Sequence, residues 1–173
     1  MATPKEAKEV LKRFWIETPS WAYGNSGTRF KVFAQPGVPR DPYEKIADAA
    51  QVHKFTGAAP SVAMHIPWDK VDDYKHLADY AKEQGVRLGT INSNTFQDQP
   101  DQPHSYKFGS LQHVDAGVRR QAIDHNIEVI KQGIELGSKS LTVWLSDGSC
   151  FPGQLNFRKA FQNTLESLQK VYA

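Results

Sequence analysis

Short apolar segments alternate with longer amphipathic ones along the chain. Four of the short segments are rich in apolar or β-branched residues and are bounded by Gly, Pro or polar clusters, a pattern that predicts strands. They are Phe14–Ser20, Ser61–Ile66, Arg87–Asn92 and Ser140–Leu145. Each is too short for a helix of ordinary length. We therefore expect strands separated by helices from one end of the chain to the other.

The helices are predicted by their end signals and their spacing. Asp41 as N-cap, Pro42 at the first helical position and Glu44 as the capping-box acid begin a helix that runs to about Phe55, before Gly57. Three further helices are expected over about Val71–Gln84, over about Asp115–Leu136 and from Asn156 to the last residue.

The third of these four helices has the clearest periodicity. Its isoleucines recur at spacings of four, three and four and so share one stripe: Ile123, Ile127, Ile130 and Ile134. Gly137 follows this helix, as Gly85 follows the one before it, and both suit the left-handed conformation that ends a helix.

Strands that alternate with helices must lie parallel, because each crossover helix returns the chain to the same end of the sheet. Four such units are half of an eight-stranded barrel. We expect an α/β fold, a parallel (β/α)4 half of a (β/α)8 TIM barrel, with residues 1–173 as a single N-terminal half-barrel segment. The long connections 23–40, 93–114 and 146–155 follow strands, where barrel enzymes build their active sites.

Composition narrows the class of protein. The chain has 173 residues, 39% of them hydrophobic, and a formal net charge of +2. The sequence contains no block of five like charges, so it gives no support for a nucleic-acid partner. The single cysteine, Cys150, forms no internal disulfide, which favours a reducing compartment. No apolar run approaches the roughly 18 residues of a membrane span, so we expect a cytoplasmic protein without a membrane partner.

The most informative chemistry lies at the predicted strand ends. His65 ends the second strand, and Asp69, four residues later, could accept a hydrogen bond from its ring. A structural histidine bonded to a loop carbonyl is an equally good interpretation. Trp21 and Trp144 stand at the ends of the first and fourth strands, and three strand ends with Trp, His and Trp would line one mouth of a barrel. Such apolar walls around an imidazole suit a sugar.

Other polar residues carry weaker signals. His104 lies in the long third loop, where a solvated side chain is favoured over a catalytic one. The remaining histidines have no metal-ligand spacing and are expected to be structural or solvent-facing: His53, His76, His113 and His125. The glycines form no nucleotide-binding motif. Asp147 could bind a hydroxyl or cap a turn.

Several motifs together resemble the L-rhamnose isomerases of the Pseudomonas type, and more distantly xylose isomerase. They are Pro19–Trp21, Gly27–Phe30, His65–Asp69, Asn92–Phe96, His104–Lys107, Leu141–Trp144, Asp147–Ser149 and Phe151–Gln154. The resemblance extends from about Ala7 to the last residue. These families are metal-dependent barrels that interconvert aldoses and ketoses.

The resemblance implies roles for individual residues. His65 would contact the sugar near its anomeric end and help to open the ring, with Asp69 orienting it. Trp21 and Trp144 would form the apolar walls of the substrate pocket. Phe96 matches a residue that reaches into the active site of a neighbouring subunit, which implies a homo-oligomer.

The resemblance also implies divalent metal ions, commonly Mn²⁺, bound by residues of strands five to eight. The chain ends before a fifth strand, so we assign no metal ligand within it and expect the ligands outside this segment. In the complete enzyme the metal ions would polarise sugar oxygens while hydrogen moves between C1 and C2. The chain is therefore expected to be inactive alone.

Two alternatives remain open. A related sugar epimerase would use a similar barrel. A non-catalytic, sugar-binding or self-associating half-barrel is also possible, because an open parallel sheet exposes unpaired backbone at its edges.

Overall fold

Four parallel strands form the central sheet of the protein, which a computed structural model describes over residues 2–24, 27–28, 31–33, 35–146, 148–149, 151 and 153–173. Their spatial order is β1 (Glu17–Pro19), β4 (Ser61–Ile66), β5 (Arg87–Thr95) and β6 (Leu141–Leu145). Every neighbouring pair is parallel, with Thr18 opposite Val62 and Asn92 opposite both His65 and Thr142. The strands therefore follow one another across the sheet in chain order, as they do around a barrel.

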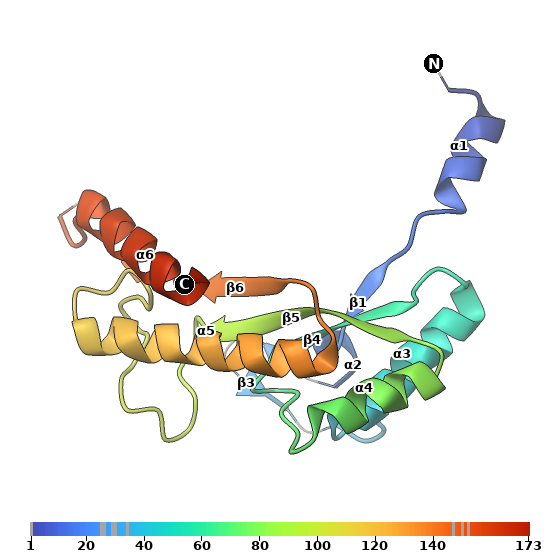
Figure 1. The fold of residues 1–173 in the computed structure, drawn as a ribbon, viewed down its shortest axis with the longest axis horizontal. Coiled ribbons are helices and arrows are strands. Elements are labelled where there is room, and N and C mark those ends of the chain that lie inside the picture. The colour runs from blue at the N-terminus through green and yellow to red at the C-terminus, as the bar shows by residue number, and fades with distance from the viewer. Residues whose placement is uncertain are drawn as a thin grey trace.

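Helices follow each of these strands (Figure 1). They are α3 (Pro42–Thr56), α4 (Tyr74–Glu83), α5 (Ala116–Leu136) and α6 (Phe157–Tyr172). Helices α3, α4 and α5 pack on one face of the sheet, and α6 packs beside α5. The predicted parallel (β/α)4 half-barrel is confirmed.

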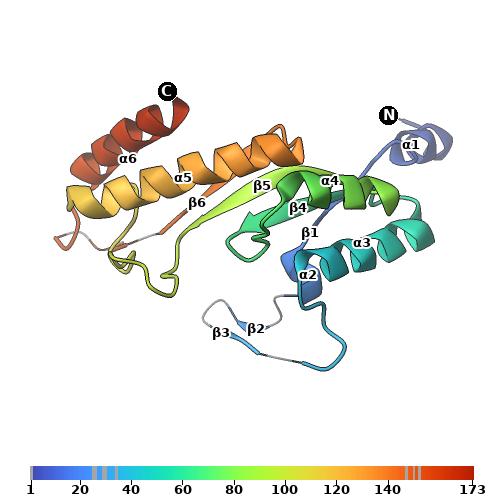
Figure 2. The same cartoon turned by 60° about the horizontal axis from the view of Figure 1, so that its bottom comes forward.

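Three small elements lie between β1 and α3, and one helix precedes β1. They are α2 (Trp21–Gly24), the antiparallel pair β2 (Gly27–Thr28) and β3 (Lys31–Val32), and α1 (Pro4–Leu11). The pattern of the sequence predicted none of the four. Helix α1 has no buried residue and lies apart from the sheet layers (Figures 1 and 2).

The hydrophobic core lies between the sheet and α3, α4 and α5. Val62, Met64 and Ile66 project from β4 into this core, where Ile46 of α3 and Leu77 of α4 meet them. Since side chains alternate along a strand, the residues between them, among them His65, project to the other face of the sheet. One face of β4 therefore stabilises the fold while the other presents polar groups.

The caps follow the predicted signals, but the predicted capping box does not form, because the Glu44 carboxylate accepts the backbone N–H of Arg40 instead of that of Asp41. Asp41 and Asp115 cap α3 and α5, and each accepts a backbone N–H bond. Gly85 and Gly137 adopt the left-handed conformation, with φ of 79° and 76°. The predicted start of α4 at Val71 is wrong, because Asp73 accepts the N–H of His76 and so caps the helix further along the chain.

Two strand boundaries also differ from prediction. Strand β1 covers only Glu17–Pro19 of the predicted Phe14–Ser20, because pairing with β4 is confined to those three residues. Strand β5 continues beyond Asn92 to Thr95, since β6 pairs with Asn94 and Thr95. The polar sequence Asn-Ser-Asn-Thr carries no apolar strand pattern, and pairing to a neighbouring strand makes it extended.

The isoleucine stripe of α5 is only partly buried: Ile123 is buried with Val118 and Ala122, and Ile127 packs against them. Ile134 is 70% exposed, whereas Ala122, Val129 and Leu136 are buried. Small and polar side chains let α5 approach the sheet closely: a Cβ added at Gly133 would lie 2.9 Å from a methyl carbon of Ile91. No helix in the described part of the chain is long and apolar enough to span a membrane.

Leu77→Ala tests the assigned core. Leu77 is fully buried between α4 and the sheet, so we expect the substitution to lower the free energy of unfolding by about 2–5 kcal/mol. Phe55→Ala at a side chain that is 83% exposed is the control, with an expected change within about 0.5 kcal/mol. Urea unfolding of both variants gives the comparison, and equal losses would contradict the core assignment.

Candidate functional site

His65 lies near the carboxyl end of β4, on the face of the sheet opposite the core. Its side chain is 1% exposed. Both ring nitrogens are buried without a hydrogen-bond partner. A buried polar atom without a partner costs roughly 1–3 kcal/mol, so this ring is better suited to an incoming polar group than to a purely structural role.

Aromatic rings surround His65 at the same end of the sheet. Trp68 stacks on the imidazole with ring centroids 3.9 Å apart, and Trp21 meets it edge-on at 5.4 Å. Phe96, which follows β5, lies 6.0 Å from His65 and 5.7 Å from Trp144. The three predicted aromatic residues are thus brought together with His65, and we call these five side chains the aromatic cluster.

Trp68 is the member of the cluster that sequence reasoning missed. It stands three residues after His65 in the turn that leads to Asp69, and its ring also lies 6.3 Å from Phe96. A tryptophan between a strand-end histidine and an aspartate was the available signal. Only the path of the turn brings the ring back over the imidazole.

Trp144 is held in place by a polar contact from the neighbouring strand. Its indole Nε1 donates to Asn92 Oδ1 at 3.0 Å, and Asn92 Nδ2 donates to the carbonyl of Met64 at 2.9 Å. The ring remains partly exposed. This combination of a fixed orientation and a free apolar face suits a wall of a carbohydrate pocket.

Asp69 makes no hydrogen bond to the imidazole of His65, which corrects the sequence-based expectation. Its Oδ2 accepts the backbone N–H of His65 at 2.7 Å and the hydroxyl of Ser20, and its Oδ1 lies 2.6 Å from Nζ of Lys45. Asp69 therefore fixes the backbone at the end of β4. Sequence reasoning missed Ser20 and Lys45, because nothing in their local sequence indicates contact with a residue 24 or more positions away.

His125 of α5 joins the ends of two strands. Its Nε2 accepts the backbone N–H of Asn94 at 3.1 Å, which supports the predicted structural role. Burial lowers its pKa, although Glu128 and the backbone of Ile66 oppose the shift. Asn94 itself is buried, and both polar atoms of its side chain lack partners. The strand ends therefore hold two buried side chains, His65 and Asn94, that can still form hydrogen bonds.

The charge state of His65 follows from its surroundings. Burial, with smaller contributions from His125 and Lys45, lowers its pKa to about 3. The ring is therefore neutral near pH 7. A neutral imidazole offers one N–H donor and one acceptor, which matches a pair of sugar hydroxyl groups.

His104 is exposed, in agreement with the predicted solvated loop, and its backbone N–H bonds to Gln121. Asp147, Cys150, Arg29 and Phe30 lie outside the described residues. Among the residues that are described, no group of three or more His, Cys, Asp or Glu side chains could hold a metal ion. These residues do not fit the divalent ions that the sequence resemblance implies, and the expected location of the ligands outside this segment remains a prediction.

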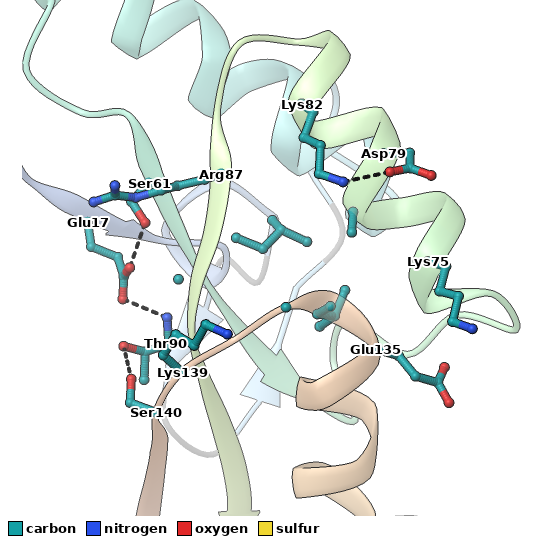
Figure 3. Close-up of a pocket in the computed structure, with 15 residues that line it drawn as sticks. Glu17, Ser61, Lys75, Asp79, Lys82, Arg87, Thr90, Glu135, Lys139 and Ser140 are labelled. Carbon is teal, nitrogen blue, oxygen red and sulfur yellow. Dashed lines mark hydrogen bonds and ion pairs between the residues drawn. The ribbon is translucent and has the colours of Figure 1, made fainter.

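A cavity of about 720 Å³ lies at the opposite end of the sheet (Figure 3). Glu17 at its edge accepts bonds from Ser61 and Thr90, and Lys82 pairs with Asp79. Burial alone would raise the pKa of Glu17, but these hydrogen bonds and the charge of Arg87 hold it below its usual value. The polar groups here largely satisfy one another, and in barrels the amino ends of the strands serve stability. We therefore place the functional site at the carboxyl ends.

Two curated proteins are similar in sequence. The chain is 49% identical over 166 residues to a probable sugar isomerase of Rhizobium meliloti (strain 1021), and 51% identical over 163 residues to one of Mesorhizobium japonicum. These matches cover 96% and 94% of the chain but only 39% and 38% of the relatives. The chain thus spans about two fifths of the length of these relatives. No protein-family model matches it.

Several solved structures with a similar fold are epimerases. An L-ribulose 3-epimerase matches with a TM-score of 0.60 and 16% identity, covering 91% of this chain and 44% of that one. A D-allulose 3-epimerase from Methylomonas sp. matches with 0.58 and 14%, covering 91% and 46%. At these identities the likeness establishes the fold alone. With the curated relatives, the matches support the sugar isomerase-like superfamily and do not distinguish L-rhamnose isomerase within it.

The low pKa of His65 predicts an acid-sensitive contribution to stability. The unfolded chain binds a proton on this histidine below about pH 6.5, whereas the folded chain does so only near pH 3. Stability should therefore be fully retained above pH 6.5 and decline as the pH falls from 6.5 towards 3, by up to about 1.4 kcal/mol per pH unit.

His65→Phe removes this titration, and we expect a shallower decline in the free energy of unfolding between pH 6 and pH 4. Urea unfolding at several pH values gives the slope. The same series with His104→Phe at the exposed loop is the control. Equal slopes for the two variants would mean that His65 is not the group that takes up the proton.

Proposed function

We propose that this chain supplies the carbohydrate-binding strand ends of a sugar isomerase barrel that interconverts an aldose and a ketose, with L-rhamnose and L-rhamnulose as the substrate pair. The observation that carries the proposal is His65, whose two ring nitrogens lack partners inside the aromatic cluster. The similarity to probable sugar isomerases supports the reaction class. L-Rhamnose rests on the resemblance of the sequence motifs.

Each part of the site has a role in this proposal. The faces of Trp21 and Trp144 bind the apolar C–H surface of the sugar and exclude water. Trp68 and Phe96 pack around the imidazole, and a sugar that reaches His65 must displace part of this contact. Phe96 contacts rings of its own chain. Its contribution to a neighbouring subunit in a homo-oligomer remains a prediction.

His65 acts on the hydroxyl groups near the anomeric carbon. One unprotonated ring nitrogen accepts the proton of the anomeric hydroxyl while the bond between C1 and the ring oxygen breaks, and the same nitrogen then returns that proton to the ring oxygen. The carbonyl group at C1 forms and the ring opens, with no net change in the protonation of the histidine. The transfer of hydrogen between C1 and C2 needs groups beyond the residues described, for which the resemblance implies divalent metal ions such as Mn²⁺.

An epimerase is the second candidate. The fold matches an L-ribulose 3-epimerase and a D-allulose 3-epimerase over most of the chain. The aromatic cluster would bind a ketose as readily as an aldose, because stacking senses the shape of a sugar only coarsely. The position at which the sugar changes distinguishes the two candidates.

A chimera tests the proposal in a complete protein. This chain replaces the matched segment of the Rhizobium meliloti relative, and the purified chimera is supplied with Mn²⁺ and either L-rhamnose or L-ribulose. We expect ketose formation from L-rhamnose, measured by chromatography. Change of L-ribulose at C3 instead would favour the epimerase. If the parent relative is active and the chimera converts neither sugar, both the isomerase and the epimerase proposals are contradicted.

His65→Asn in the chimera tests the assigned role. Loss of the ring removes its proton transfer, so we expect kcat to fall by about 100-fold or more. His104→Asn, in the exposed loop, is the matched control and should retain the activity of the chimera. Equal activity of the two variants would exclude His65 from the reaction.

A further inference from the structure

The carboxylate of Asp69 joins three separate elements below the aromatic cluster. Its Oδ2 accepts the N–H of His65 on β4 and the hydroxyl of Ser20, which follows β1. Its Oδ1 accepts from Lys45 Nζ of α3 at 2.6 Å. Asp69 is completely buried. The end of β1, the end of β4 and a helix therefore meet at one carboxyl group.

The side chain of Lys45, which contacts this carboxylate, is buried and closely packed. Its side chain is 4% exposed, and its Nζ also lies 3.4 Å from the carbonyl oxygen of Trp68. A Cβ added at Gly24 would lie 2.6 Å from Cε of Lys45 and 2.9 Å from the carbonyl of Pro39, so the last residue of α2 must be small. The amine is thus held against Trp68 and Asp69 of the turn that follows β4.

The charge of Lys45 stabilises the carboxylate of Asp69 in its buried position. A buried carboxylate is strongly destabilised when its partner charge is removed. Without that charge the carboxylate of Asp69 would either take up a proton or turn towards water, and either change would alter its hydrogen bonds to Ser20 and to the N–H of His65. The position of Trp68 would change with it, because Trp68 and Asp69 are adjacent in the turn.

We propose that Lys45 is a positioning residue of the His65 site. It acts through Asp69 to set the position of the imidazole at the end of β4 and the stacking of Trp68 on it. Its relevance to sugar conversion rests on the proposed function. The positioning itself is a property of this chain and can be measured without a sugar.

The ion pair between Lys82 and Asp79 provides a matched control. It has a similar length, 2.7 Å, but its side chains are 73% and 66% exposed. Removing that lysine leaves a carboxylate that is already hydrated. Lys82→Met therefore makes the same chemical change as Lys45→Met without disturbing a buried carboxylate.

The experiment follows the imidazole signal of His65 by NMR and the near-UV circular dichroism of the tryptophans in the 173-residue chain. The His65 signal is assigned by its absence in His65→Phe. In Lys45→Met we expect this signal to shift and the tryptophan band to weaken, with far-UV circular dichroism unchanged. Lys82→Met should leave all three at their original values.

A double variant separates action through Asp69 from an independent role of the lysine. Lys45→Met with Asp69→Asn removes both charges, and an asparagine oxygen can still accept the N–H of His65. We expect its His65 signal to lie closer to that of the original chain than the signal of Lys45→Met does. Additive shifts of the two single variants in the double variant would overturn the proposal.

Ser20→Ala gives a second approach that removes no charge. It deletes one of the two donors to Oδ2, so a smaller shift of the His65 signal is expected. If Lys45→Met fails to fold, Ser20→Ala decides the question. An unchanged His65 signal in Ser20→Ala would then overturn the proposal.

The chimera then connects positioning with catalysis. In the chimera, Lys45→Met should displace the imidazole of His65 and lower kcat by about 100-fold with a smaller change in KM. Misplacement of a reacting group affects mainly the chemical step. An unchanged kcat would overturn the link to the reaction. If the chimera converts no sugar while Lys45→Met still shifts the His65 signal, the proposed function fails and the positioning role stands.

Discussion

The arrangement of the site depends on one buried carboxylate. Asp69 receives hydrogen bonds from the backbone of His65 and the side chain of Ser20, and an ion pair from Lys45 compensates its charge. Removing one partner of a buried ion pair typically costs about 3–5 kcal/mol, so these contacts are strongly coupled. Trp21 follows Ser20, and Trp68 precedes Asp69. Two rings of the aromatic cluster are therefore attached to residues that the carboxylate fixes.

The two faces of the sheet are specialised. Towards α3, α4 and α5 the strands present apolar side chains that form the core. Towards the other face they present polar groups, and near the carboxyl ends some of these lack partners, namely those of His65 and Asn94. Unpartnered polar atoms beside aromatic rings are costly for the isolated chain. They become favourable when a polyhydroxylated ligand supplies hydrogen bonds and an apolar surface together.

The sheet does not close among the described residues, and β1 and β6 form its two edges. Strand β6 is at an edge, and the neighbouring helix α6 exposes a stripe of large apolar side chains, Phe157, Phe161, Leu165, Leu168 and Tyr172. Exposed edges and apolar stripes favour association with further strands and helices. The similar sugar isomerases are longer than the segment that this chain matches. This exposed surface is consistent with the proposal that the activity belongs to a complete barrel.

The sequence by itself determined the alternation of strands and helices, the helix caps and the placement of His65, Trp21 and Trp144 at strand ends. These features depend on local physics, namely side-chain periodicity and the bonding of backbone groups by Asp41, Asp115 and similar residues. The resemblance of the motifs led to sugar isomerisation, and the curated relatives support that class without fixing the substrate.

The tertiary structure decided what depends on contacts between distant residues. It extended β5 through a polar sequence because β6 pairs with it, and it exposed Ile134 although a regular stripe predicted burial. It turned the carboxylate of Asp69 from the expected imidazole to the backbone, and it joined Lys45 to that carboxylate across α3 and β4. Such contacts leave no periodic trace in the sequence, because their energy arises only when the fold removes both groups from water.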